Sequence, residues 1–180
     1  GVKTFNFDWP PQTEVTTRLR DILEDNVDER FYLSEEKTAK LVAQLRDKEL
    51  KISENRKDNE INPIEEVRPV LTPDRETKRQ EGRRFKENDD PAFTLNTQDR
   101  HGVAIGQPPK YRIRKLTPRE TFRLQGFPDS EFDKLVAAGI SNSQLYKMAG
   151  NAVTVNVVEA IGSRLLPLVQ THASERPHRQ

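Results

Sequence analysis

The stretch from Gln144 to Ile161, QLYKMAGNAVTVNVVEAI, constrains the fold of this chain most strongly. Its pattern predicts a short helix, a tight turn at residues 149–151, and a long helix that begins near Val153. Gly150 suits the turn because it adopts backbone angles that other residues avoid, and Asn151 is of a type that caps helix starts. The start of such a helix can attract an anion, although a capped helix in an ordinary core explains the same residues. Apolar residues recur on the second helix at spacings of three and four, which predicts one apolar face: Val153, Val157, Val158, Ile161, Leu165 and Leu166.

Composition limits the classes of protein to which the chain can belong. Of its 180 residues, 33% are hydrophobic and another 33% are charged. This is too polar for a full independent core and favours a chain that packs on a larger partner. The net charge of +1 does not by itself indicate nucleic acid, and the absence of cysteine excludes disulfides and thiolate chemistry. The three histidines are scattered, so no metal site is predicted. Because no apolar run reaches membrane-spanning length and no signal peptide is present, we expect no membrane contact and a cytoplasmic location.

The first part of the chain predicts mixed helix and strand. Residues 48–66 are charged and lack periodicity, which indicates a long loop. Pro69 confines any strand that contains it to a sheet edge. The predicted elements are a short strand at 5–7, a short helix at 15–23, a helix from 34 to about 47, and a strand at 67–71.

The segment 72–105 carries the candidate contacts to nucleic acid. Short strands are predicted at 93–95 and 103–105, joined by a polar tip. At the tip, Gln98 and Arg100 are side chains that pair with adenine and guanine in the major groove, although a polar hairpin without a ligand fits the same pattern. Basic residues in 72–90 alternate with acidic ones, which suits either a solvated surface or contacts to phosphates: Arg75, Lys78, Arg79, Arg83, Arg84 and Lys86.

Two capping boxes mark helix starts in the last third of the chain. Residues 111–116, YRIRKL, alternate and predict a strand with one basic face. Thr117 to Glu120 forms a capping box with proline at the first helical position, and Ser141 to Gln144 forms another. These patterns predict an α+β fold: a small, irregular, mostly antiparallel sheet domain followed by a C-terminal helical segment.

Two stretches resemble the last two motifs of the DNA cytosine-5 methyltransferases, usually numbered nine and ten. These are RIRKLTPRETFRLQGFP at 112–128 and QLYKMAGNAVTVNVVEAI at 144–161, in the family's order and at its separation. The segment PAFTLNTQDRHGV at 91–103 is similar to the end of that family's target recognition region. The resemblance implies an enzyme that transfers a methyl group from S-adenosylmethionine to C5 of cytosine in duplex DNA.

The family's other motifs are absent. The catalytic Cys of its Pro-Cys dipeptide, its Glu-Asn-Val motif, its glycine-rich cofactor loop and its Gln-x-Arg-x-Arg motif do not occur in this sequence. The resemblance therefore implies the C-terminal part of such an enzyme, either an expressed fragment or one subunit of a split enzyme. We expect no catalytic residue in this chain and no activity from it alone. The resemblance implies that an N-terminal catalytic part with a Rossmann-like fold binds most of the cofactor, and that the helical segment packs on that part.

The resemblance also assigns candidate sites. It implies cofactor contacts by Gly150, Asn151, Ala152 and Val153; many members have Ser where this chain has Ala152, so only a backbone contact is available there. Its Thr-Leu dipeptide matches Thr94 and Leu95, and with Gln98, Arg100, Arg83 and Arg84 these are the candidate DNA contacts. The predicted parts are 1–47, the N-terminal segment of the small domain; 48–110, the target recognition region; 111–168, the strand and helices of the last two motifs; and 169–180, a tail.

Two further expectations remain open. A stand-alone DNA-binding module without enzymatic activity is the alternative function. If the apolar face built on Val157, Ile161 and Leu165 lacks its partner, we expect the isolated chain to self-associate or to be partly disordered.

Overall fold

The computed structural model describes residues 7–14, 16–53, 65–75, 82–107 and 110–174, without the side chains of 46–53 and 169–174. Most of the strand predicted at 5–7, much of the loop predicted at 48–66, Lys78, Arg79 and the last six residues of the tail lie outside this description. The described elements are α1 (Leu19–Ile22), η1 (Glu29–Phe31), α2 (Glu35–Ser53), β1 (Glu66–Leu71), β2 (His101–Gln107), β3 (Lys110–Lys115), α3 (Pro118–Leu124), α4 (Asp129–Ala137), α5 (Asn142–Asn151) and α6 (Val155–Ser174).

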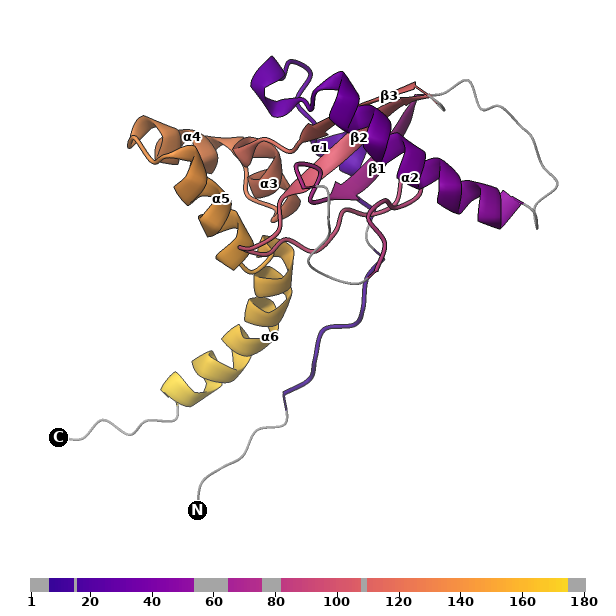
Figure 1. The fold of residues 1–180 in the computed structure, drawn as a ribbon. Helices are drawn as coiled ribbons and strands as arrows, with labels where there is room; N and C mark the ends of the chain where they lie inside the picture. Colours follow the sequence, from indigo (N-terminus) through magenta and orange to yellow (C-terminus); the bar gives the residue numbers. More distant parts are fainter. Residues whose placement is uncertain (1–6, 15, 54–64, 76–81, 108–109, 175–180) are drawn as a thin grey trace.

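The three strands form an antiparallel sheet in the order β1-β2-β3, as Figure 1 shows. Val103 of β2 lies opposite Pro69 of β1 and Arg114 of β3. Pro69 stands on an edge strand, where its missing N–H removes no inner ladder bond, as predicted. The α+β class and the strands expected at 67–71, 103–105 and 111–116 are confirmed.

The strand predicted at 93–95 is wrong, because residues 91–96 have no regular secondary structure. Both edges of β2 are already paired, one with β1 and the other with β3. Residues 93–95 therefore have no free edge at 103–105 with which to form the expected hairpin. The helix predicted to end near Asp47 is also longer than expected, since α2 runs to Ser53.

Hydrophobic clusters cover both faces of the sheet. Successive residues of β2 point to opposite faces. Ala104 belongs to the cluster on one face, where α2 contributes Leu41, Val42 and Leu45. Val103 belongs to the cluster on the other face, with side chains of α1. Full burial of each of these aliphatic side chains of α2 stabilises the fold by about 1.5–3 kcal/mol.

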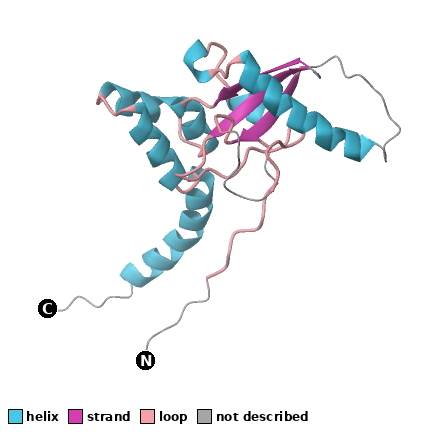
Figure 2. Cartoon of the chain, in the orientation of Figure 1, coloured by secondary structure: helices cyan, strands magenta, loops and turns pink. Residues whose placement is uncertain are grey.

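A third cluster joins the helices α3, α4 and α5. Phe122 of α3 packs edge-on against Phe132 of α4, with ring centroids 5.3 Å apart. Leu145 and Ala149 of α5 complete the cluster, and Leu95 packs against it from the loop before β2. Figure 2 shows α6 extending away from these helices and from the sheet.

A buried ion pair connects the sheet to α3. Arg114 of β3 donates from Nη1 and Nη2 to the carboxylate of Glu120 at 2.8 and 2.7 Å, and neither side chain is more than 1% exposed. The same carboxylate accepts from the backbone nitrogen of Thr117, while Glu120 N donates to the Thr117 hydroxyl, so the predicted capping box is confirmed. It also accepts from the backbone nitrogen of Glu24 at 2.9 Å. These partners satisfy the buried carboxylate of Glu120, whereas Nε of Arg114 is buried without a hydrogen-bond partner.

Candidate functional site

The C-terminal end of α5 packs against the loop that precedes β2. A Cβ placed on Gly150 would lie 2.6 Å from the backbone oxygen of Asn96 and 2.9 Å from the backbone nitrogen of Thr97. Two backbones approach this closely only where a residue has no side chain. The structure therefore brings together two segments that the sequence assigns to different tasks, DNA contact and cofactor contact.

The side chain of Asn96 fixes the shape of this loop. Its Oδ1 accepts from the backbone nitrogens of Gln98 and Asp99 at 2.8 and 2.7 Å, and its Nδ2 donates to Asp99 Oδ2 at 3.0 Å. Asparagine commonly stabilises turns in this way. The turn leaves Gln98 and Arg100 exposed. Arg100 lies 3.5 Å from a carboxylate oxygen of Asp74, in an ion pair that is open to solvent.

A hollow of about 390 Å³, named the basic groove, lies beside this contact and is lined by the loop and by α5. Among the described residues that line it, four are cations and one is a carboxylate, Asp99. The excess of positive charge suits an anionic ligand such as a phosphate group. The cations are Arg75, Arg100, Lys115 and Lys147. Sequence reasoning did not select Lys115 or Lys147, because a single lysine in a strand or helix carries no local signal of its neighbours in the fold.

His101 and Tyr146 also line the basic groove but add no charge. Burial lowers the pKa of His101 to about 4, and the nearby Asp99 carboxylate opposes this only in part. The imidazole is therefore neutral at pH 7. Burial raises the pKa of Tyr146, whose hydroxyl donates to the backbone oxygen of Leu116 at 2.6 Å.

The predicted turn at 149–151 is wrong, because these residues form the last turn of α5. The backbone nitrogen of Ala152 donates to Met148 O at 3.0 Å, which continues the helical pattern past Gly150. The chain breaks at 152–154 and α6 begins at Val155, so Asn151 ends one helix rather than capping the next. Asn151 is exposed, Ala152 is half-buried and Val153 is 62% exposed.

The other predicted DNA contacts differ in exposure, and of these only Leu95 lines the basic groove. Thr94 and Arg83 are exposed, and Leu95 is half-buried. Arg84 is only 5% exposed, and burial lowers the pKa of its guanidinium. A phosphate contact requires an accessible guanidinium, and of the two arginines only Arg83 is exposed. DNA contact by either residue stays a prediction.

The predicted apolar face of α6 lies at the surface. Val157, Val158, Leu165 and Leu166 are between 44% and 58% exposed, and Ile161 is half-buried. Apolar patches of this kind are typical of interaction surfaces.

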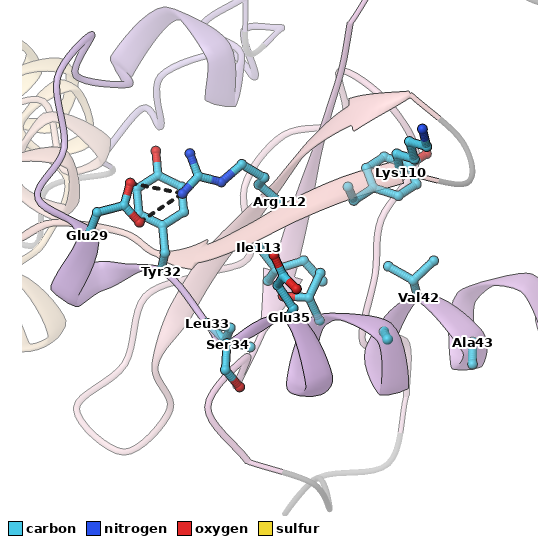
Figure 3. Close-up of a pocket in the computed structure, with 13 residues that line it drawn as sticks. Glu29, Tyr32, Leu33, Ser34, Glu35, Val42, Ala43, Lys110, Arg112 and Ile113 are labelled. Atoms are coloured by element: carbon cyan, nitrogen blue, oxygen red, sulfur yellow. Dashed lines mark hydrogen bonds and ion pairs between the residues drawn. The ribbon is translucent and has the colours of Figure 1, made fainter.

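A second hollow, of about 870 Å³, lies between α2, η1 and β3, as Figure 3 shows. At its edge Arg112 donates from Nη2 to both carboxylate oxygens of Glu29 at 2.9 and 2.8 Å. Its guanidinium also stacks on the ring of Tyr32, 4.0 Å from the centroid. The basic face predicted for residues 111–116 is thus neutralised at Arg112.

The part of the chain that the structure describes offers neither a metal site nor a membrane-spanning helix. Those residues contain no group of three or more His, Cys, Asp or Glu side chains placed to hold a metal ion. Across the same residues, every helix is too short or too polar to span a bilayer.

Comparison with known proteins tests the resemblance of the two sequence motifs to one enzyme family. The family model for C-5 cytosine-specific DNA methylases matches residues 1–166, and the chain belongs to this family. An orphan methyltransferase of Bacillus phage SPbeta is 49% identical over 212 aligned positions, which cover 97% of this chain and 48% of that protein. One from Bacillus phage SPR is 40% identical and shares 92% of this chain and 53% of its own length. A type II methyltransferase of Bacillus sp. strain RFL6 is 29% identical over 91% of this chain and 44% of its own length. The chain thus spans about half the length of these relatives. No solved structure matches it.

Proposed function

We propose that this chain is the target-recognition and cofactor-closing part of a DNA cytosine-5 methyltransferase. The observation that carries the proposal is the contact between Gly150 and the backbone of Asn96, which brings the segments that carry the two predicted sites side by side. The family membership of residues 1–166 supports the same reading.

Duplex DNA is the partner on the groove side. Lys115, Lys147 and Arg83 contact phosphates, which set the position of the duplex but carry no sequence information. Gln98 and Arg100 lie on the exposed turn fixed by Asn96 and reach base edges, with Thr94 and Leu95 beside them.

S-adenosylmethionine is the cofactor, and it supplies the methyl group. The residues at the end of α5 fit its methionine end: the exposed amide of Asn151 both donates and accepts, as neighbouring amino and carboxylate groups require. The exposed Val153 offers an apolar surface. Gly150 lies within α5, and the N–H of Ala152 already donates to Met148 O, so the backbone contact expected at Ala152 is the second acceptor position of its oxygen, beside Gln125 Nε2. The N-terminal catalytic part provides most of the binding.

The reacting groups lie outside this chain. The sequence has no cysteine, so the thiolate that attacks the cytosine ring comes from the catalytic part. The target base leaves the DNA stack to reach that thiolate. The apolar face of α6 packs on the Rossmann-like catalytic part, which explains why the described residues leave that face uncovered.

The test is transfer of a labelled methyl group to mixed-sequence DNA. The chain is assayed alone, with the N-terminal half of the phage SPbeta relative supplied separately, and joined to that half in one polypeptide. That half alone is the control. We expect transfer only when both parts are present. Transfer by this chain alone, or no transfer from a pair shown to associate, would contradict the proposal.

A stand-alone DNA-binding module is the second candidate, because the basic groove is formed entirely by this chain. The variant Asn151→Ala separates the two. In the methyltransferase it abolishes methyl transfer and leaves DNA affinity nearly unchanged; in a module that only binds DNA it has no consequence.

A further inference from the structure

Gln125 occupies an unusual position at the end of α3. It is the C-cap residue of that helix, it is 7% exposed, and its side chain points to the α5–α6 junction, defined here as residues 149–155. A buried glutamine amide requires partners for both its nitrogen and its oxygen.

Every polar group of Gln125 beyond its own helix bonds to this junction. Nε2 donates to the backbone oxygens of Ala149 and Ala152 at 2.8 and 3.3 Å. Oε1 accepts from the hydroxyl of Thr154 at 2.9 Å. The backbone oxygen of Gln125 accepts from the backbone nitrogen of Val155 at 2.8 Å.

These four partners lie at the end of α5 and the start of α6. At such helix ends, backbone groups lack hydrogen-bond partners within their own helix. The oxygen of Ala149 lies in the last turn of α5, and the nitrogen of Val155 begins α6. Gln125 thus satisfies both ends and fixes the break between the helices. The residues from Gly150 to Val153 lie between its outermost contacts.

We infer that Gln125, together with Thr154, is a positioning residue for the cofactor-facing segment Gly150–Val153 and thereby sets cofactor affinity. This inference rests on the proposed function. Gln125 itself is buried below the segment, whereas Asn151 and Val153 are exposed. It acts by holding the backbone that presents them.

The test compares Gln125→Met, which keeps side-chain length but removes both polar groups, with the milder Thr154→Val, which removes only the hydroxyl. Thr154→Ser, which keeps the hydroxyl, and Gln44→Met on the exposed face of α2 are the matched controls. Each variant is placed in the joined polypeptide described above. S-adenosylmethionine affinity is measured by calorimetry, DNA affinity by titration of a duplex, and folding by thermal unfolding.

We expect Thr154→Val, which removes one hydrogen bond, to weaken cofactor binding roughly fivefold to tenfold. Gln125→Met removes all three side-chain bonds and should weaken cofactor binding more. DNA affinity stays within twofold of the unmutated protein, and both controls bind cofactor normally. Equal losses of cofactor and DNA binding, in step with a lower melting temperature, would mean that Gln125 only stabilises the fold and would overturn the inference.

The variant Asn151→Ala separates this inference from the function on which it rests. If Asn151→Ala weakens cofactor binding and the variants at 125 and 154 do not, the inference alone fails. If Asn151→Ala binds the cofactor normally, the proposed cofactor site is wrong, and the role of Gln125 falls with it.

Discussion

Replacing Gly150 with alanine tests the contact between α5 and the loop before β2. The added Cβ would lie 2.6 Å from Asn96 O, 2.7 Å from Asn96 C and 2.9 Å from Thr97 N, all of them backbone atoms that cannot rotate away. Ordinary contact begins at about 3.5 Å, so the loop or the helix must move by almost 1 Å.

The expected cost follows from two opposing effects. Overpacking of this kind destabilises by about 1–3 kcal/mol. The higher helix propensity of alanine relative to glycine stabilises the folded chain by up to about 1 kcal/mol. The net loss of about 1–2 kcal/mol lowers the melting temperature of a chain of this size by about 2–8 °C.

Gly162→Ala is the matched control, because Gly162 also lies in a helix and nothing stands within 4 Å of its added Cβ. It should raise the melting temperature slightly. The assay is thermal unfolding of the chain followed by far-ultraviolet circular dichroism. If Gly150→Ala stabilises the chain as Gly162→Ala does, the close approach of the two backbones does not exist in solution.

Four other predictions use the same structure. Arg100→Ala should reduce the preference for one base by about 1–3 kcal/mol in DNA binding across a duplex library. Lys147→Ala should weaken binding to all sequences alike, and the salt dependence of DNA affinity should fall by about the amount of one phosphate contact. The opposite pattern would exchange the roles of the two residues. Glu120→Gln should cost about 3–5 kcal/mol in urea unfolding, because Arg114 would stay buried without its counter-charge, while Glu29→Gln at the exposed pair should cost under about 1 kcal/mol. The lowered pKa of His101 means that the unfolded chain binds a proton that the folded chain excludes, so stability should fall as pH drops from 6.5 to about 4, and His101→Gln should flatten this slope. We expect the isolated chain to self-associate in light scattering, and Val157→Glu with Leu165→Glu should reduce that association; an unmutated chain that is monomeric at every concentration would contradict this prediction.

Local patterns predicted those parts of the fold that depend on local physics. The capping boxes at Thr117–Glu120 and Ser141–Gln144 form as expected, because each bond joins residues three apart. Pro69 predicted an edge strand because proline has no N–H to donate in the hydrogen-bond ladder of an inner strand.

Long-range contacts decided the features that sequence reasoning missed. The strand at 93–95 failed because strands distant in sequence hold both edges of β2, which no local pattern reports. The sequence predicts backbone freedom as the reason for glycine at position 150, whereas the structure shows a close approach to Asn96, a residue far away along the chain. Gln125 carried no signal at all, since its importance depends on which helix ends lie beside it.

The buried pair between Arg114 and Glu120 has a consequence for how the protein moves. It spans the short connection from β3 to α3, where a hinge between the sheet and the helices would otherwise be expected, and the backbone of Glu24 bonds to the same carboxylate. A rotation of the sheet away from α3 would separate the two charges and leave each one without its partner in a nonpolar environment, so this connection resists bending. Under the proposed function, the expected DNA-contacting surface and the segment held by Gln125 would move as one rigid block, and an opening that admits DNA would occur where this block meets the proposed catalytic part.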